Sequence, residues 1–273
     1  MWSQRIDEGL QLGGVMQFRV AQAARVTGTM LERLVREKLQ EDHIPEVDCV
    51  ICYGAGYSGA LPSLNATCST SNKMTQGQAL SAALGSEALP IFVGRPPVRP
   101  SPTQTFIARK IKHSKGRDMI VCDSPRRLTI ALERGRDYFT PLVDSDTEYR
   151  VWVYRKRILA VYEKRLTEAA NNHKFGRNRA NGYTFHQLKK DRIPEGVRRV
   201  AVAAVSSLNL DFGAVDILGK KGTSSLDITP TVLEVNSAPG VSDEHRSAIV
   251  KLTHRIVRWI ANGCPARTPV ERN

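Results

Sequence analysis

Two apolar stretches near the C-terminal end of the chain carry isolated polar residues. Residues 213–218 read Gly-Ala-Val-Asp-Ile-Leu, and residues 231–236 read Thr-Val-Leu-Glu-Val-Asn. Short apolar runs of this kind predict buried strands. Since side chains alternate between faces along a strand, Glu234 and Asn236 should point the same way. If the two strands pair antiparallel, Asp216 lies beside them, and three hard oxygen donors suited to Mg²⁺ share one face. The alternative is a hairpin with a polar outer face.

The same patterns predict elements along the rest of the chain. Apolar positions at helical spacing predict helices over residues 29–40, 71–84, 194–208 and 242–261. Continuous or alternating apolar runs predict strands over residues 47–53 and 89–93, a strand, basic loop and strand over 105–121, and a hairpin over 148–165.

Composition places the chain among ordinary soluble globular proteins. It has 273 residues, of which 41% are hydrophobic and 25% charged. No apolar run is long enough to span a bilayer and the N-terminus lacks a signal-peptide core, so we expect a cytoplasmic protein without a membrane partner. Five cysteines include one Cys-x-x-Cys pair, Cys49 and Cys52, in an apolar run. This context favours buried reduced thiols over a zinc site.

The charge of the chain is strongly basic and unevenly spread. The formal net charge is +13, and residues 150–199 contain 14 Lys or Arg against 4 Asp or Glu. Such an excess indicates an acidic partner, with nucleic acid, an acidic protein tail and glutamate-like substrates as the alternatives. Aromatic residues make up only 6% of the chain and do not interleave with the basic residues, which weakens the nucleic-acid interpretation. A solvated basic face is the simpler alternative.

The segments 210–218 and 233–240 together resemble the closing half of an ATP-grasp ligase. They are most similar to the branch that contains the ribosomal-protein glutamate ligases and related carboxylate–amine ligases. The resemblance implies an α/β (α+β) protein with the ATP-grasp fold. It also implies ATP as a ligand, with Asp216, Glu234 and Asn236 holding one or two Mg²⁺ ions, for which Mn²⁺ can substitute.

The resemblance extends over residues 47–262 and implies three lobes. Residues 1–94 would form an N-terminal α/β lobe. Residues 95–143, which begin with a Pro-rich run, would form a small ATP-grasp lobe with a phosphate flap. Residues 144–273 would form a large lobe with the metal site, and both ATP-binding lobes would contain antiparallel sheets.

Basic residues of two segments acquire roles through the resemblance. In the hairpin, Arg150 would act as a catalytic residue and Lys164 would bind the nucleotide, although a solvated surface hairpin gives the same pattern. In the loop of residues 171–183, Arg179 and Asn181 would lie near the γ-phosphate and the reacting carboxylate. Arg177 could exchange roles with Arg179, and a surface loop is the alternative.

The segment 105–121 resembles the flap that covers the ATP phosphates. Small residues let backbone N–H groups approach an anion, while nearby cations neutralise it. Arg109 occupies the position at which many relatives carry a nucleotide-contacting lysine, and a single glycine marks the loop. The nucleotide-binding candidates here are Arg109, Lys110, Lys112, Ser114 and Gly116.

Together these features imply ATP-dependent ligation of a carboxylate to an amine through an acylphosphate. The two substrates would be carried by an amino acid, a peptide or a protein. Two other functions remain open: a basic nucleic-acid-binding protein with a non-catalytic ATP-grasp shell, and a kinase that stops at phosphoryl transfer. The oligomeric state is also open, with a homo-oligomer as one alternative.

Overall fold

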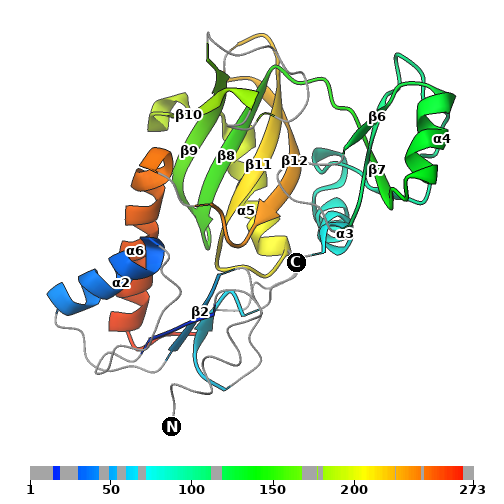
Figure 1. Ribbon diagram of the computed structural model, residues 1–273. Helices are drawn as coiled ribbons and strands as arrows, with labels where there is room; N and C mark the ends of the chain where they lie inside the picture. The colour runs from blue at the N-terminus through cyan, green and yellow to red at the C-terminus, as the bar shows by residue number, and fades with distance from the viewer. Residues whose placement is uncertain are drawn as a thin grey trace.

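A five-stranded sheet occupies the centre of the molecule (Figure 1). The computed structural model describes residues 15–18, 30–42, 49–53, 60–66, 72–111, 119–167, 177, 181–224, 226–240 and 243–266. The central strands are β8 (Thr147–Tyr154), β9 (Arg157–Leu166), β10 (Tyr183–Gln187), β11 (Phe212–Lys221) and β12 (Ile228–Asn236). They follow the order β10-β9-β8-β11-β12, and every neighbouring pair is antiparallel.

Two smaller sheets and five α-helices complete the described part of the chain. One small sheet contains β1 (Val15–Phe18), β2 (Cys49–Cys52) and β3 (Ser63–Leu64). The other contains β4 (Phe92–Val93), β5 (Phe106–Arg109), β6 (Ile120–Cys122) and β7 (Tyr138–Pro141). The helices are α2 (Met30–Glu41), α3 (Lys73–Leu84), α4 (Pro125–Glu133), α5 (Glu195–Ser207) and α6 (Arg246–Ala261). Three short 3₁₀ turns are η2 (Gly85–Glu87), η4 (Lys190–Arg192) and η5 (Asp243–His245).

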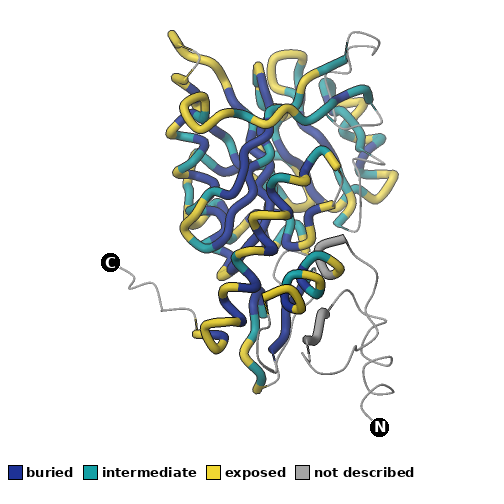
Figure 2. The backbone as a smooth tube through the Cα atoms, turned by 90° about the vertical axis from the view of Figure 1, so that its left-hand side faces the viewer, coloured by how far each residue is buried: buried dark blue, intermediate teal, exposed yellow. Residues whose placement is uncertain are grey.

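Alternation along β8 builds two cores, one on each face of the central sheet. Val151 and Val153 pack with residues of α5, whereas Trp152 and Tyr154 pack with residues of α6. The sheet is therefore buried on both sides, as the dark blue centre of Figure 2 shows. Each face excludes water from apolar area, which is the main stabilising contribution to the fold.

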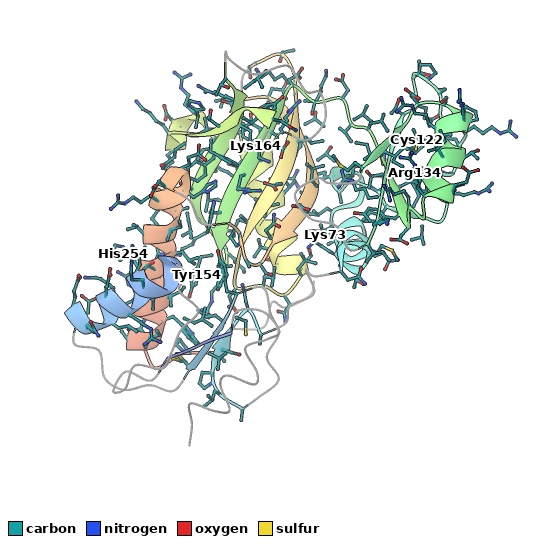
Figure 3. The ribbon with its side chains drawn as sticks, in the orientation of Figure 1. Lys73, Cys122, Arg134, Tyr154, Lys164 and His254 are labelled. Atoms are coloured by element: carbon teal, nitrogen blue, oxygen red, sulfur yellow. The ribbon has the colours of Figure 1, made fainter. Side chains whose placement is uncertain are left out.

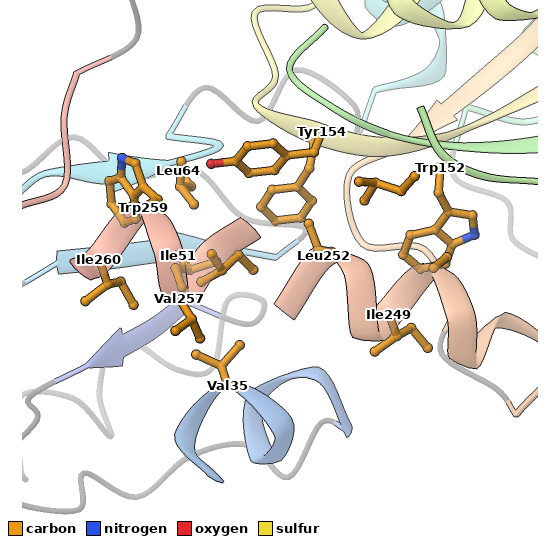
Figure 4. Packing of buried hydrophobic residues seen from close by; sticks show 14 of the residues in the cluster. Val35, Ile51, Leu64, Trp152, Tyr154, Ile249, Leu252, Val257, Trp259 and Ile260 are labelled. Atoms are coloured by element: carbon orange, nitrogen blue, oxygen red, sulfur yellow. The ribbon is translucent and has the colours of Figure 1, made fainter. Parts of the chain in front are cut away.

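The core on the α6 face also joins the N-terminal sheet to the rest of the molecule. Val35 of α2 and Ile51 of β2 belong to the same core as Leu252 and Val257 of α6, and Figure 4 shows both of them beside Val257. α3 contacts α5 and β12 on the other side of the sheet. Cys49 and Cys52 are buried, as predicted, and neither takes part in a disulfide among the described residues.

The small lobe is a separate antiparallel sheet of order β4-β7-β5-β6, covered by α4. Ser124 caps α4, because its side chain accepts a hydrogen bond from the backbone N–H of Arg127, and Pro125 occupies the first turn. In Figure 1 this lobe stands apart from the central sheet, next to α3.

Most predicted elements are confirmed, with two corrections. The strand predicted over residues 89–93 was wrong in extent, since only Phe92 and Val93 form β4. Leu89 instead donates its backbone N–H to the carbonyl of Val232 at the edge of β12. The last helix begins as the turn η5 before it becomes α6. The α/β (α+β) class and the antiparallel sheets are confirmed, whereas the exact lobe boundaries stay a prediction. Among the described residues, no helix combines the length and apolar character that crossing a membrane requires.

Candidate active site

A polar patch interrupts the α6 face of the central sheet. On this face Trp152 of β8 pairs with Ala214 of β11, and both belong to the core. One step further along the same face, Arg150 pairs with Asp216. Cross-strand partners lie close together, so this step replaces an apolar contact with a charged one. The patch also contains Glu148, two residues before Arg150 on the same strand.

Arg150 and Asp216 form a bidentate ion pair at the centre of this patch. The Arg150 Nε lies 2.8 Å from Asp216 Oδ1, and Nη2 lies 2.7 Å from Oδ2. Only 6% of the Asp216 side chain is exposed. Burial by itself would raise the pKa of the Asp216 carboxyl, but the charges of Arg150 and Lys164 outweigh burial and hold this pKa well below its usual range. Asp216 is therefore ionised at neutral pH.

Glu234 lies directly opposite Asp216 on β12. The pairing register shifts at this point and leaves Leu233 as an extra residue, a bulge that re-aims neighbouring side chains. Asn236 donates its side-chain N–H to Glu234 Oε1 at 3.1 Å, and Lys73 Nζ lies 2.9 Å from Glu234 Oε2. Burial opposes ionisation of Glu234, but the Lys73 ammonium lowers the pKa of this carboxyl below its ordinary value.

Glu148 and Lys164 form a third ion pair beside the first two. Lys164 Nζ binds the Glu148 carboxylate and lies 3.8 Å from Asp216 Oδ1. Burial raises the pKa of Glu148, and the Asp216 charge adds to this effect while Lys164 opposes it. The site therefore contains three carboxylates and three cations in a largely buried cluster. Figure 3 shows two of these cations, Lys164 on the central sheet and Lys73 on α3.

Aromatic rings form one wall of the cluster. The Phe185 ring of β10 faces two cations, with its centroid 5.2 Å from Arg150 Cζ and 5.6 Å from Lys164 Nζ. His245 packs edge-on against Phe185 and Tyr162, at centroid distances of 4.5 and 5.0 Å. Burial, aided by the Arg150 charge, lowers the pKa of His245 to about 4, so this imidazole is neutral at physiological pH.

The small lobe contributes Arg109 from the end of β5. Arg109 pairs across the sheet with the buried Tyr138 of β7. Burial raises the pKa of the Tyr138 phenol, Arg109 opposes this, and the nearby Glu234 charge adds to it. Tyr138 of the small lobe therefore lies within electrostatic range of Glu234 on β12. The Arg109 Nε is buried and has no hydrogen-bond partner among the described residues, which fits an anion contact. Lys110, the next residue, is exposed.

In the basic loop of residues 171–183, Arg177 is the arginine that the structure describes, and it lies near Glu148. Arg177 Nη2 donates to the backbone carbonyl of Ser145 at 2.7 Å, and the Arg177 charge weakly opposes the burial that raises the pKa of Glu148. Asn181 is half-buried just ahead of β10. The other nominated residues lie outside the described residues; they are Arg179, Lys112, Ser114 and Gly116. Their roles stay predictions.

The donor set fits a hard divalent cation. Asp216, Glu234 and Asn236 supply two carboxylates and an amide oxygen from adjacent strands. Across the described ranges, no three His, Cys, Asp or Glu side chains are grouped as a metal site. Two carboxylates nevertheless suffice for Mg²⁺, which takes its remaining ligands from waters and substrate phosphates. Arg150 already pairs with Asp216, and Lys73 with Glu234. Each carboxylate oxygen nevertheless retains a second lone pair with which it can bind a metal ion.

The sequence of this chain matches the model of a known protein family. The sequence model described as "RimK-like ATP-grasp domain" matches residues 107–260, more than half of the chain, and this stretch includes all three candidate metal ligands. The chain belongs to the RimK-like ATP-grasp domain family. ATP-grasp ligases use ATP and a divalent metal, in agreement with the donor set described above.

Curated relatives of this ATP-grasp chain are named as glutamate ligases. Over 80 residues it is 36% identical to the probable alpha-L-glutamate ligase 1 of Shewanella sp. (strain ANA-3), covering 29% of this chain and 24% of the relative. Over 162 residues it is 19% identical to the probable alpha-L-glutamate ligase of Legionella pneumophila (strain Corby), covering 57% and 49%. The chain thus spans about a quarter to about half of the length of these relatives.

A solved structure shows the same fold. The ATP-grasp ligase PsnB complexed with minimal precursor superposes with a TM-score of 0.54 at 13% identity, covering 75% of this chain and 66% of that one. At this identity the likeness extends to the ATP-grasp fold alone.

Sequence reasoning missed two members of the cluster in this ATP-grasp domain. The sequence predicts Glu148 only as the first residue of the hairpin over residues 148–165, and Lys73 only as part of the helix over residues 71–84. Their signal was weak, because each ion pair joins residues far apart in the sequence: Lys73 pairs with Glu234, and Glu148 with Lys164.

Proposed function

We propose that this chain is an ATP- and Mg²⁺-dependent carboxylate–amine ligase. The observation that carries the proposal is the facing pair Asp216 and Glu234, with Asn236 beside them and with cations on the same face of the sheet. Hard oxygen donors next to fixed cations suit a nucleotide whose phosphates carry a metal. Membership of the RimK-like ATP-grasp domain family supports the same assignment.

The reaction follows from the chemistry of the two substrates. A carboxylate oxygen attacks the γ-phosphorus of ATP, ADP leaves, and an acylphosphate forms. The amine nitrogen then attacks the acyl carbon, inorganic phosphate leaves, and the nitrogen loses a proton as the amide forms. Phosphate leaves far more readily than the oxide of a free carboxylate would. When bound, Mg²⁺ would neutralise charge on the transferring phosphoryl group.

Residues of this chain would orient the reactants. Arg150 would hold Asp216 in place through Nε and Nη2, and the rest of its guanidinium group would bind phosphate. Lys164 would add positive charge to the same face of the sheet. Arg109 has a buried Nε free to meet an anion, which supports a nucleotide contact. Asn181 and the undescribed Arg179 are proposed for the γ-phosphate side, with Arg177 as the described alternative.

We propose glutamate as the first amine to test, because the curated relatives are named alpha-L-glutamate ligases. Peptides are the first carboxylate carriers to test, because PsnB is described with a precursor. The acidic or nucleic-acid partner, the homo-oligomer and the cytoplasmic location stay predictions.

The proposal is tested by ADP release and product mass. The chain is incubated with Mg-ATP, glutamate, pooled amino acids and peptides, and compared with Glu234→Ala. The exposed Glu195→Ala serves as the matched control. We expect ADP and a condensation-sized mass gain, both lost with Glu234→Ala and kept with Glu195→Ala. ADP with phosphorylated product and no condensation would instead establish a kinase. Retained turnover in Glu234→Ala would overturn the proposed site.

A further inference from the structure

Gln76 in the first turn of α3 holds the backbone of the metal-ligand strand. Its side-chain Nε2 donates to the carbonyl of Val235 at 2.8 Å, and its Oε1 accepts from the Val235 N–H at 3.0 Å. Only 1% of Gln76 is exposed. Val235 lies between Glu234 and Asn236. One buried amide side chain therefore hydrogen-bonds to both backbone groups of the single residue that separates two proposed metal ligands.

These two hydrogen bonds satisfy backbone groups at the outer edge of the central sheet. β12 is the last strand of the central sheet, and β11 pairs with only one of its two edges. The outward N–H and C=O of Val235 would otherwise be buried without partners, which costs free energy. An amide side chain presents an N–H donor and a C=O acceptor side by side, and so replaces the missing strand at this residue. Leu89 continues the same edge by donating to the carbonyl of Val232.

α3 is capped at its start and packs against both β12 and the segment before β4. Asn72 caps the helix by accepting hydrogen bonds from the backbone N–H groups of Met74 and Thr75. Gly77 allows the segment around Ile91 to approach α3 closely, since a Cβ at this position would lie 2.0 Å from Ile91 Cδ1. The helix start is therefore a fixed support, and Lys73, three residues before Gln76, lies on the same helix face and reaches Glu234.

We infer that Gln76 is a positioning residue for the metal and nucleotide site. It acts by fixing the backbone of Val235, the residue between Glu234 and Asn236. The bulge at Leu233 makes this support necessary, because the β11 pairing is irregular directly beside the ligands. The inference rests on the proposed function and adds a supporting residue to its site.

The first test measures Mn²⁺ binding in the presence of ADP by electron paramagnetic resonance. We expect Gln76→Ala to weaken Mn²⁺ binding roughly 10- to 100-fold, the usual effect of losing a group that supports metal ligands. Gln78→Ala is the matched control, because Gln78 is exposed on the same helix, and it should bind as the unsubstituted chain does. Circular dichroism checks that each variant is folded.

A second variant separates positioning from folding. Gln76→Glu keeps the shape of the side chain, but an ionised carboxylate cannot donate to the Val235 carbonyl. A protonated carboxyl regains one donor and one acceptor. Mn²⁺ binding to Gln76→Glu should therefore be weak at pH 8 and recover toward the unsubstituted value as the pH falls toward 5.5. This recovery is the opposite of the ordinary loss of metal binding in acid.

The outcomes distinguish the two proposals. Binding to Gln76→Ala at the unsubstituted affinity, or Gln76→Glu without recovery in acid, would overturn the role of Gln76 and leave the ligase assignment intact. Failure of the unsubstituted chain to bind Mn²⁺ with ADP would overturn the proposed function and this inference with it. If Gln76→Ala does not fold, the pH response of Gln76→Glu decides.

Discussion

Strand β11 carries two ion pairs of the same length in different surroundings. In the middle of the strand, Asp216 Oδ2 lies 2.7 Å from Arg150 Nη2, and at the strand end Lys220 Nζ lies 2.7 Å from Asp144 Oδ2. Only 6% of the Asp216 side chain is exposed, against 48% for Lys220. The distance between two charges therefore says little about what their pairing contributes.

The environment of each pair decides its consequence. Water and salt screen the Lys220–Asp144 pair, and either partner can be hydrated alone. Asp216 cannot be hydrated in the same way, so it depends on Arg150 and Lys164 for its charge to be tolerated. The buried region thus contains the counterions that keep Asp216 charged.

The largest expected effect comes from breaking the buried pair. Asp216→Ala should destabilise the fold by about 3–5 kcal/mol, because it leaves the Arg150 charge buried without its partner. Urea unfolding at pH 7 measures the free energy of unfolding. Asp144→Ala, the control at the exposed pair, should leave the unfolding midpoint unchanged. The double variant Arg150→Met with Asp216→Leu should recover much of the loss; equal midpoints for Asp216→Ala and Asp144→Ala would contradict the comparison.

A smaller effect should follow from titration of the buried His245. Its pKa in the folded chain is about 4, below the ordinary value of 6.5. As the pH falls through 6.5 the unfolded chain takes up the proton first, so stability is complete above 6.5 and declines toward pH 4, by up to about 3 kcal/mol. His245→Phe should flatten this decline between pH 6.5 and 4.5. The exposed His254→Gln should keep it, and an unchanged slope in His245→Phe would exclude His245 as its source.

The smallest effect is expected at the half-buried pair of Lys73 and Glu234. Lys73→Met should cost on the order of 1 kcal/mol of stability. It should also raise the pKa of Glu234, which Lys73 keeps low against the effect of burial. The acid limb of Mn²⁺ binding with ADP should therefore move to higher pH. Lys156→Met, at an exposed turn, is the control, and coinciding pH profiles for the two variants would show that Lys73 does not set the ionisation of Glu234.

Local patterns predicted the strands of the site well. The apolar runs around Asp216 and Glu234 identified β11 and β12, and the alternation along residues 148–154 identified β8. Each of these patterns spans only about ten residues, and over such a short range the spacing of apolar side chains indicates which face of the strand is buried. The strand predicted over residues 89–93 was wrong in extent, because Leu89 bonds to the edge of β12 instead of extending β4.

The supporting residues could not be predicted in the same way. Gln76 in a helix start looks like any polar residue of an amphipathic helix, and only its contact with Val235 shows its importance. The bulge at Leu233 could not be predicted from the sequence either, since it depends on the register in which β11 and β12 pair. Such features require knowledge of which distant segments meet.

The sequence by itself determined the strands that carry the candidate site, β8, β9, β11 and β12, and which of their residues share a face. It also determined that hard oxygen donors and cations gather in the second half of the chain. The tertiary structure decided which cation neutralises which carboxylate: Arg150 for Asp216, Lys73 for Glu234 and Lys164 for Glu148. The physical reason is that periodicity is a local property of the chain. Ion pairing in a buried site depends on strand register and helix docking, which the packing of two cores on opposite faces of the sheet establishes.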